Sequence, residues 1–160
     1  MKKAALFPIG LAAFLAFMTA VIGSTITVLD EWYYSLQQPP WAPPDWLFGI
    51  AWTIIFAMIA LAGYLAWFKA PTRRDIDYAL TLFALNGFLN LLWSFLFFRL
   101  QRPDWAFYEL TLLWLSILML IIFCARFSRG AALLLLPYLV WVSFAGALNF
   151  QIVHLNAPFG

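Results

Sequence analysis

Five long apolar segments constrain this chain more than any other feature. Each meets the roughly 20 apolar residues that a helix needs to cross the hydrocarbon core of a bilayer. The segments cover residues 4–28, 46–68, 76–98, 105–125 and 131–153. Backbone polar groups in lipid must be paired, and no period-two alternation suggests a membrane β-barrel. The sequence therefore predicts an all-α membrane protein, a bundle of five transmembrane helices.

The connections between these segments predict how the helices are arranged. The second, third and fourth connections have only a few residues, so successive helices must be antiparallel and adjacent. We expect residues 1–160 to form a single transmembrane domain. The first segment is longer than the roughly 7–15 apolar residues of a signal peptide, so we expect a span there too.

The composition excludes several classes of protein. Of the 160 residues, 66% are hydrophobic and 10% are charged, whereas ordinary soluble domains have about 45–50% apolar and 25% charged residues. The charges form short clusters between apolar runs, so nucleic acid is not an expected partner. The single cysteine, Cys124, excludes an internal disulfide, and the single histidine, His154, excludes a histidine-rich site. We expect neither a metal nor a cofactor.

The first connection, residues 29–45, has an unusual composition that continues into the second segment. Residues 32–52 contain no Lys or Arg. They carry the aromatic residues Trp32, Tyr33, Tyr34, Trp41, Trp46 and Trp52, and the prolines Pro39, Pro40, Pro43 and Pro44. Each proline fixes φ, removes a backbone donor and disfavours helix at the preceding residue. We expect residues 29–45, called the lid below, to be a stiff aromatic loop without regular secondary structure that covers one end of the bundle.

The positions of Lys and Arg predict the orientation in the membrane. Seven of the nine lie at the N-terminus and in the second and fourth connections, on one side of the bundle. They are Lys2, Lys3, Lys69, Arg73, Arg74, Arg126 and Arg129. Only Arg99 and Arg102 lie on the other side. Because cytoplasmic loops carry the excess of basic residues, we expect a cytoplasmic N-terminus, with the lid and C-terminus outside, if the membrane is a bacterial plasma membrane.

Polar residues inside the third and fourth segments need partners. Asn86 and Asn90 share one helix face with Trp93, and buried amides in lipid must point inward. They can either join helices through hydrogen bonds or contact a ligand. Glu109 lies about one turn into the fourth segment. An ionisable group in a span can be functional; the stronger expectation is that the Glu109 side chain reaches the interface, where the helix N-terminus favours its charge.

Aromatic residues below the lid indicate a site for a flat ligand. Tryptophans near the segment ends suit an interfacial belt, but Trp52, Trp114 and Trp141 lie deeper. At 1.5 Å per residue, the deeper aromatic rings and the amides can meet one cavity under the lid; packing alone remains the alternative. The candidate ligand-binding residues are Trp32, Trp41, Trp52, Phe56, Asn86, Asn90, Trp93, Tyr138, Trp141, Ala145, Leu148 and Asn149.

A series of short motifs runs through the chain in order. They are Trp32-Tyr33 with Leu36, Pro40-Trp41-Ala42-Pro43-Pro44, Trp52, Asn90 with Trp93, Phe97-Phe98, Pro137-Tyr138-Leu139-Val140-Trp141, Phe144-Ala145 and Leu148-Asn149. Together they resemble the TspO/translocator protein family, also called the peripheral-type benzodiazepine receptor family, over nearly the whole chain. The resemblance implies a five-helix bundle, commonly a homodimer. It also implies a pocket under the first loop for porphyrins, other tetrapyrroles, sterols and aromatic drugs, and a role in regulation or stress.

The resemblance carries further expectations for single residues. Some bacterial members break down protoporphyrin in light with the help of tryptophan, and Trp52 and Trp141 match those positions. Ala145 matches a small residue that affects sterol or drug binding. Phe150 and His154 stand where the animal sterol motif has Tyr and Arg, so a porphyrin-like ligand is expected rather than a sterol.

The sequence is compatible with three functions. A receptor for tetrapyrroles agrees with the aromatic and amide residues. A transporter has less support, because the sequence shows neither an inverted repeat nor a charged relay deep in the bilayer. An enzyme lacks a Ser-His-Asp set, paired buried carboxylates and a metal cluster, so no acid–base residue is expected to be catalytic. Photochemistry at Trp52 or Trp141 needs none of these groups.

Overall fold

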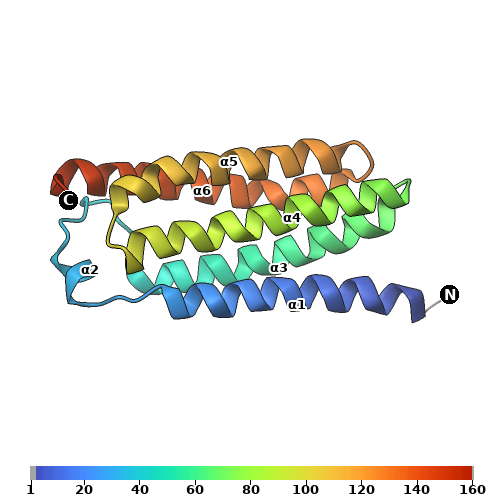
Figure 1. Cartoon of the computed structure of the whole chain (residues 1–160), viewed down its shortest axis with the longest axis horizontal. Coiled ribbons are helices and arrows are strands. Elements are labelled where there is room, and N and C mark those ends of the chain that lie inside the picture. Colours follow the sequence, from blue (N-terminus) through green and yellow to red (C-terminus); the bar gives the residue numbers. More distant parts are fainter. Residues whose placement is uncertain (1–2, 160) are drawn as a thin grey trace.

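The structure, a computed structural model, is a bundle of long helices. It describes residues 3–159, with side chains from residue 8 onward. The elements are α1 (Lys3–Ile26), α2 (Glu31–Ser35), α3 (Asp45–Lys69), α4 (Arg73–Ser94), η1 (Phe95–Arg99), α5 (Pro103–Ala125) and α6 (Arg129–Asn156). The long helices lie side by side, with α2 and the C-terminus at the end opposite the N-terminus (Figure 1). Residues 3–159 contain five helices that are long and apolar enough to cross a membrane, and no strand. The predicted all-α bundle of five spans is confirmed.

Polar caps define the two tight turns at the N-terminal end of the bundle. The Thr72 hydroxyl accepts a hydrogen bond from the backbone N–H of Asp75 at 3.2 Å, so α4 begins at Arg73. The Ser128 hydroxyl accepts one from the backbone N–H of Ala131 at 3.3 Å, so α6 begins soon after α5 ends. Such caps satisfy backbone donors that have no partner within the helix.

The lid contains a short helix that we did not expect. The Asp30 carboxylate accepts a hydrogen bond from the backbone N–H of Tyr33 at 3.0 Å and caps α2. The expectation of a loop without regular secondary structure is therefore wrong for Glu31–Ser35. The physical reason is local: aspartate is a good cap, and the four prolines begin only at Pro39.

The third span ends in a π-helical turn rather than in regular α-helix. The backbone N–H of Leu100 donates to the carbonyl of Phe95 at 3.0 Å, a five-residue spacing. Phe97 and Phe98 lie in this turn, and their ring centroids are 4.8 Å apart. Both rings contact the lid, Phe97 through Trp32 and Phe98 through Tyr33. Single π turns are frequent at functional sites, and this one presents two rings to the lid.

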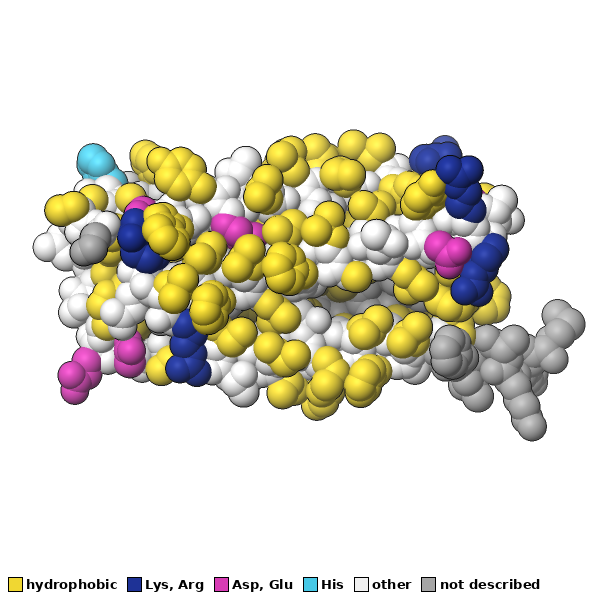
Figure 2. Space-filling model, in the orientation of Figure 1, with side chains coloured by type: hydrophobic (Ala, Val, Ile, Leu, Met, Phe, Trp, Pro, Cys, Tyr) yellow, Lys and Arg dark blue, Asp and Glu magenta, His cyan; other side chains and the backbone are white. Residues whose placement is uncertain are grey.

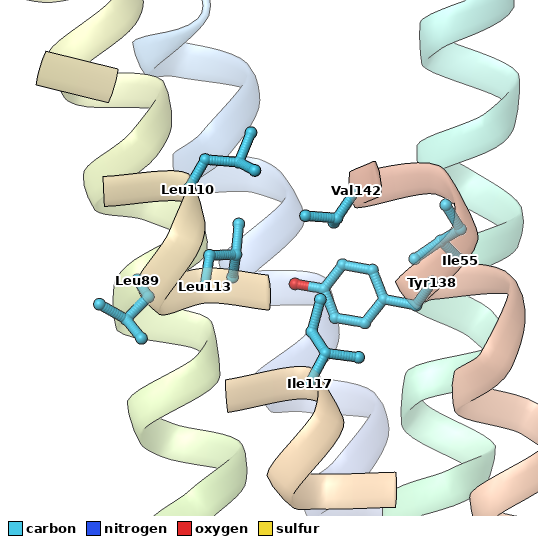
Figure 3. Packing of buried hydrophobic residues seen from close by; sticks show 7 residues of the cluster. All are labelled: Ile55, Leu89, Leu110, Leu113, Ile117, Tyr138 and Val142. Atoms are coloured by element: carbon cyan, nitrogen blue, oxygen red, sulfur yellow. The ribbon is translucent and has the colours of Figure 1, made fainter. Parts of the chain in front are cut away.

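The core of the bundle lies between α3, α4, α5 and α6. One cluster of buried residues has Tyr138 among aliphatic side chains from these helices (Figure 3). Helix α1 packs on α3 and α4 through small residues. A methyl group placed on Gly63 would lie 3.8 Å from Cβ of Ala12, and one placed on Gly87 would lie 3.7 Å from the Thr19 hydroxyl. Close backbone approach of this kind is common between helices in lipid.

The surface is that of a membrane protein. On the face shown in Figure 2, hydrophobic side chains cover the length of the bundle, whereas Lys and Arg lie toward its two ends. The described basic side chains Lys69, Arg73, Arg74, Arg126 and Arg129 belong to the connections at the end that carries the N-terminus. Arg99 and Arg102 belong to the connection at the lid end. The predicted separation of the basic residues thus agrees with the topology; Lys2 and the side chain of Lys3, which belong to the same prediction, lie outside the described residues.

Candidate functional site

The lid is joined to the end of α6 by one side-chain amide. Asn156 donates from Nδ2 to the backbone carbonyl of Gln37 at 3.0 Å. Its Oδ1 accepts from the backbone N–H of Gln37 at 2.8 Å. The amide therefore satisfies both backbone groups of a lid residue that lies in neither helix nor strand. Asn156 was not among the predicted site residues, because nothing in a single sequence pairs it with a residue near position 37.

A second set of contacts joins α2 to the start of α3. The hydroxyls of Tyr33 and Tyr34 donate to Oδ1 and Oδ2 of Asp45 at 3.1 and 3.3 Å. Burial raises the pKa of the Tyr33 phenol, and the charge and hydrogen bond of Asp45 raise it further. The phenol therefore stays protonated at neutral pH and acts as a donor. Asp45 also was not among the predicted site residues, although it directly follows the proline pairs of the lid.

A cavity of about 170 Å³ lies between the lid and the ends of α3 and α6. It is lined by Tyr33, Tyr34, Leu36, Gln38, Ala42, Pro43, Asp45, Phe48 and Leu148. Of the residues predicted from the sequence, Leu148 lines this cavity. Aromatic rings and one carboxylate therefore surround a space that is smaller than the roughly 300–1,000 Å³ of ordinary ligand pockets.

The Trp141 ring lies in an aromatic cluster below the lid. Its centroid is 5.6 Å from that of Phe48 and 5.5 Å from that of Phe144, and Phe144 in turn lies 5.9 Å from Trp41 of the lid. The indole Nε1 of Trp141 is buried and has no hydrogen-bond partner among the described residues. Buried indole N–H groups usually have a hydrogen-bond partner, so this N–H is available to donate to an acceptor atom of a ligand. Phe48 and Phe144 were missed as site residues, because phenylalanine is too common in membrane spans to stand out.

Trp52 belongs to a deeper group of rings. Its centroid lies 5.5 Å from that of Phe56 and 6.0 Å from that of Tyr138. Tyr138 is only 1% exposed, and its hydroxyl accepts a hydrogen bond from Nδ2 of Asn90 at 3.3 Å. Ala145, one to two turns further along α6, packs against the same cluster. These predicted residues are brought together, but by direct contact rather than around an open cavity.

The remaining amides join helices in this structure. Asn86 of α4 donates to the Ser116 hydroxyl of α5 at 2.9 Å. Oδ1 of Asn149 accepts from Nε1 of Trp93 at 3.2 Å, and its Nδ2 donates to the Pro103 carbonyl at 2.8 Å. In the structure these amides form hydrogen bonds between helices, which is one of the two roles expected for them. Their contact with a ligand stays a prediction.

A third aromatic group lies under α2. Trp32 of the lid is 6.1 Å from Phe97 between ring centroids, and Trp93 is 5.2 Å from Phe97. The lid therefore rests on two clusters, one around Phe97 and one around Trp141. The predicted site residues surround these contacts rather than a single cavity.

Glu109 does not reach the interface as expected. It is only 7% exposed, and neither carboxylate oxygen has a hydrogen-bond partner within residues 3–159. The reason is its position on the buried side of α5, the side that also carries Ala106, Leu113 and Ser116. Its side chain therefore lies inside the bundle. Among the same described residues, no three His, Cys, Asp or Glu side chains gather to hold a metal ion.

Comparison with known proteins decides the family. The model of the TspO/MBR family matches residues 7–155, which include the lid and nearly all of the five spans. The chain belongs to the TspO/MBR family. It is 43% identical over 136 residues to a tryptophan-rich protein TspO of Chlorobaculum tepidum, covering 84% of this chain and 86% of that protein. It is 41% identical over 133 residues to a tryptophan-rich protein TspO of Archaeoglobus fulgidus, covering 83% and 85%. It is also 34% identical over 127 residues to a translocator protein of Ovis aries, covering 79% and 75%.

Membership in the TspO/MBR family confirms the resemblance found in the sequence. The protein is a multi-pass integral membrane protein of this family. The motifs that indicated the family now have positions in space. The Pro-Trp stretch forms the lid, and the Trp141 and Asn149 motifs of α6 lie beneath or beside it.

Proposed function

We propose that this TspO/MBR family protein is a membrane receptor for porphyrins and related tetrapyrroles, which bind between the lid and helices α3 and α6. Aromatic drugs would enter the same site as other flat hydrophobic molecules. Sterols are the weaker candidates, because Phe150 and His154 stand where the animal sterol motif has Tyr and Arg. The observation that carries the proposal is the buried indole N–H of Trp141, which has no partner in the described chain and lies in an aromatic cluster directly below the lid.

The chemistry of this cluster suits a flat ligand. Rings in proteins gain from stacked or edge-to-face contact with other rings. A tetrapyrrole placed between Trp41 and Trp141 would replace the contacts that both rings now make with Phe144. An acceptor group on the ligand would satisfy the Trp141 N–H, which gains free energy because a buried donor without a partner is costly.

The size of the cavity implies that the lid moves. A cavity of about 150 Å³ holds one benzene, and the cavity under the lid has about 170 Å³. A tetrapyrrole has four linked rings, so it cannot enter without displacing the lid. The contacts that must break are those of Asn156 with Gln37 and of Asp45 with the two tyrosines.

The orientation and assembly belong to the same proposal. The basic residues at the end that carries the N-terminus support a cytoplasmic N-terminus, which places the lid on the outer side of a bacterial plasma membrane. A homodimer is supported by the family resemblance, and multi-angle light scattering of the purified protein tests it. Cysteine substitutions at Gln38 and Arg129, labelled in intact cells, test the orientation: only the Gln38 variant should react with a membrane-impermeant maleimide.

Titration of the purified protein with protoporphyrin in the dark tests the proposed function. Saturable quenching of tryptophan fluorescence is expected, because several tryptophans lie in or beside the site. Absence of saturable binding in both detergent and nanodiscs would reject the receptor for this ligand. Uptake of porphyrin into vesicles that depends on the protein would favour the transporter alternative.

Light-dependent porphyrin breakdown is a second candidate function. The supporting observation is that both Trp52 and Trp141, the tryptophans that the resemblance implies, lie in ring clusters at the proposed site. Loss of porphyrin absorbance under illumination, reduced in Trp52→Phe and Trp141→Phe variants at equal occupancy, is the expected result. Equal loss in the presence of free tryptophan instead of the protein would reject it.

A further inference from the structure

Glu109 stands apart from every other acidic residue of the chain. All seven Asp and Glu residues lie in the described part, and Glu109 is the one that is buried. It belongs to α5, which packs against α4, η1 and α6. Neither of its oxygens accepts or donates a hydrogen bond within residues 3–159. An ionisable residue inside a span is a functional hypothesis by default, and the receptor proposed above does not use this one.

The charges around Glu109 do not neutralise it. The buried polar side chains of α4 are uncharged, and α6 contributes Tyr138, which packs in one cluster with Leu110 and Leu113 of α5. His154 of α6 is exposed. Arg99 of η1 is exposed and donates to the carbonyl of Thr25 at 2.6 Å.

The guanidinium nearest to Glu109 along the chain is also engaged elsewhere. Arg102, just before α5, forms an ion pair with Asp104 and lies over the Trp105 ring. An ionised carboxylate without a partner is strongly unfavourable in a low-dielectric interior, whereas a neutral carboxylic acid is far less so.

We propose that Glu109 is a proton-binding site within the membrane, which holds its proton while the lid is closed and releases it when a ligand binds. The reaction is the transfer of one proton from the carboxyl group to water that enters as the lid opens; no bond other than O–H changes.

The packing of α5 against Tyr138 of α6 provides the coupling between Glu109 and the aromatic site. Tyr138 packs in one buried cluster with Leu110, the residue next to Glu109 on α5. Its ring centroid lies 6.0 Å from that of Trp52, and its hydroxyl accepts a hydrogen bond from Asn90. Trp141 packs against the same buried cluster as Tyr138, so a ligand that displaces the Trp141 ring changes the surroundings of Tyr138 and, through them, those of Glu109. The coupling rests on the proposed function, whereas the proton-binding site itself does not.

Infrared spectroscopy of the full-length protein in lipid nanodiscs tests the proton site without any ligand. The spectrum at neutral pH should contain a carboxylic-acid C=O band from Glu109, because the six other acids are at least partly exposed to water. The band should shift in D2O and disappear in Glu109→Gln, a variant of nearly equal shape. Asp104→Asn is the matched control and should keep the band. If the wild type lacks the band at neutral pH, or the band survives in a folded Glu109→Gln protein, the proposal is overturned; the wild-type spectrum alone decides if the variant does not fold.

Proton release on binding tests the coupling. The probe is octaethylporphyrin, a flat tetrapyrrole without carboxyl groups, added to protein in weakly buffered solution with a pH indicator dye. The wild type should release protons in a number that approaches one per bound porphyrin, and Glu109→Gln should bind without release. Binding without release in the wild type, or equal release in both proteins, overturns the coupling. Absence of binding, seen as unquenched tryptophan fluorescence, rejects the proposed function and with it the coupling, while the infrared band still decides the proton site.

Discussion

Asn156 and Gln37 are 119 positions apart in the chain, yet the side-chain amide of Asn156 makes two hydrogen bonds with the backbone of Gln37. Together with the Tyr33–Asp45 contact, this pair holds the lid on the bundle.

The change Asn156→Asp should make the lid open more often. The carboxylate keeps an acceptor for the N–H of Gln37 but loses the Nδ2 donor to the carbonyl of Gln37 and to that of Ile152 in its own helix. Only the hydrogen bond to Gln37 joins the lid to the bundle, and its loss at a partly exposed site is worth about 1 kcal/mol, so lid opening should rise roughly fivefold. Stopped-flow quenching by protoporphyrin measures this as faster association and dissociation. Gln37→Ala is the matched control, because it leaves both backbone hydrogen bonds intact; if it behaves like Asn156→Asp, the amide is not what holds the lid.

The change Tyr33→Phe should weaken the lid and remove a pH dependence. Loss of the hydrogen bond to Asp45 should cost about 0.5–1.5 kcal/mol. Because the pKa of Tyr33 is raised on folding, the folded protein holds this proton more tightly than the unfolded chain. The contribution is therefore complete below about pH 10, the pKa of free tyrosine, and is lost as the pH rises above it.

Thermal unfolding of the wild type and Tyr33→Phe at pH 8 and pH 11 measures this effect. The wild type should lose more stability between the two pH values. Tyr78→Phe at the other end of the bundle is the control, since its hydroxyl accepts from Arg74 and does not contact the lid. Equal pH slopes in the wild type and Tyr33→Phe would contradict the prediction.

The change Trp141→Phe should weaken porphyrin binding while the fold persists. It keeps an aromatic ring next to Phe48 and Phe144 but removes the N–H that has no partner within the described chain. If a ligand acceptor uses this donor, the loss is about 1–1.5 kcal/mol, or roughly five- to tenfold in Kd. The same titration on Trp46→Phe, which replaces a tryptophan that is 66% exposed, should give the wild-type affinity. An unchanged Kd for Trp141→Phe would remove Trp141 from the hydrogen-bonding role.

The change Gly146→Val should destabilise the contact between α5 and α6. A methyl group on Gly146 would already lie 3.0 Å from Cδ2 of Leu110, so the larger side chain must push the helices apart. Overpacking of this kind costs about 1–3 kcal/mol. Gly49→Val is the control, because nothing lies within 4 Å of a methyl group there. Thermal unfolding in detergent should show a lower midpoint for Gly146→Val alone; equal midpoints would mean that the two helices can separate at little cost.

The spacing of residues in the sequence predicted which residues share a helix face. It could not predict which residues of other helices they contact. Asn86, Asn90 and Trp93 share one face, as their spacing requires, and the two amides are buried. Their partners, Ser116 and Tyr138, come from other helices. Each partner depends on how two helices are rotated and shifted against each other, which no local pattern records.

Glu109 shows the same limit for a single residue. Its place near the start of a span was evident from the sequence. Its side chain could point either toward the interface or into the bundle. The rotation of α5 decided between them, since Glu109 shares the side that carries Ala106 and Leu113. That rotation is set by packing along the whole helix, and the charge of one residue does not outweigh it.

The sequence by itself determined the five spans, the family motifs and the positions of the rings and amides along each helix. It could do so because crossing a bilayer depends on length and hydrophobicity, which are local properties of the chain. Only the tertiary structure decided that Asn156 holds the lid, that the rings pack in separate clusters with a cavity of about 170 Å³, and that Glu109 lies inside the bundle without a partner in the described chain. Those features join residues from different helices, and the packing of all the helices together determines which side chains meet.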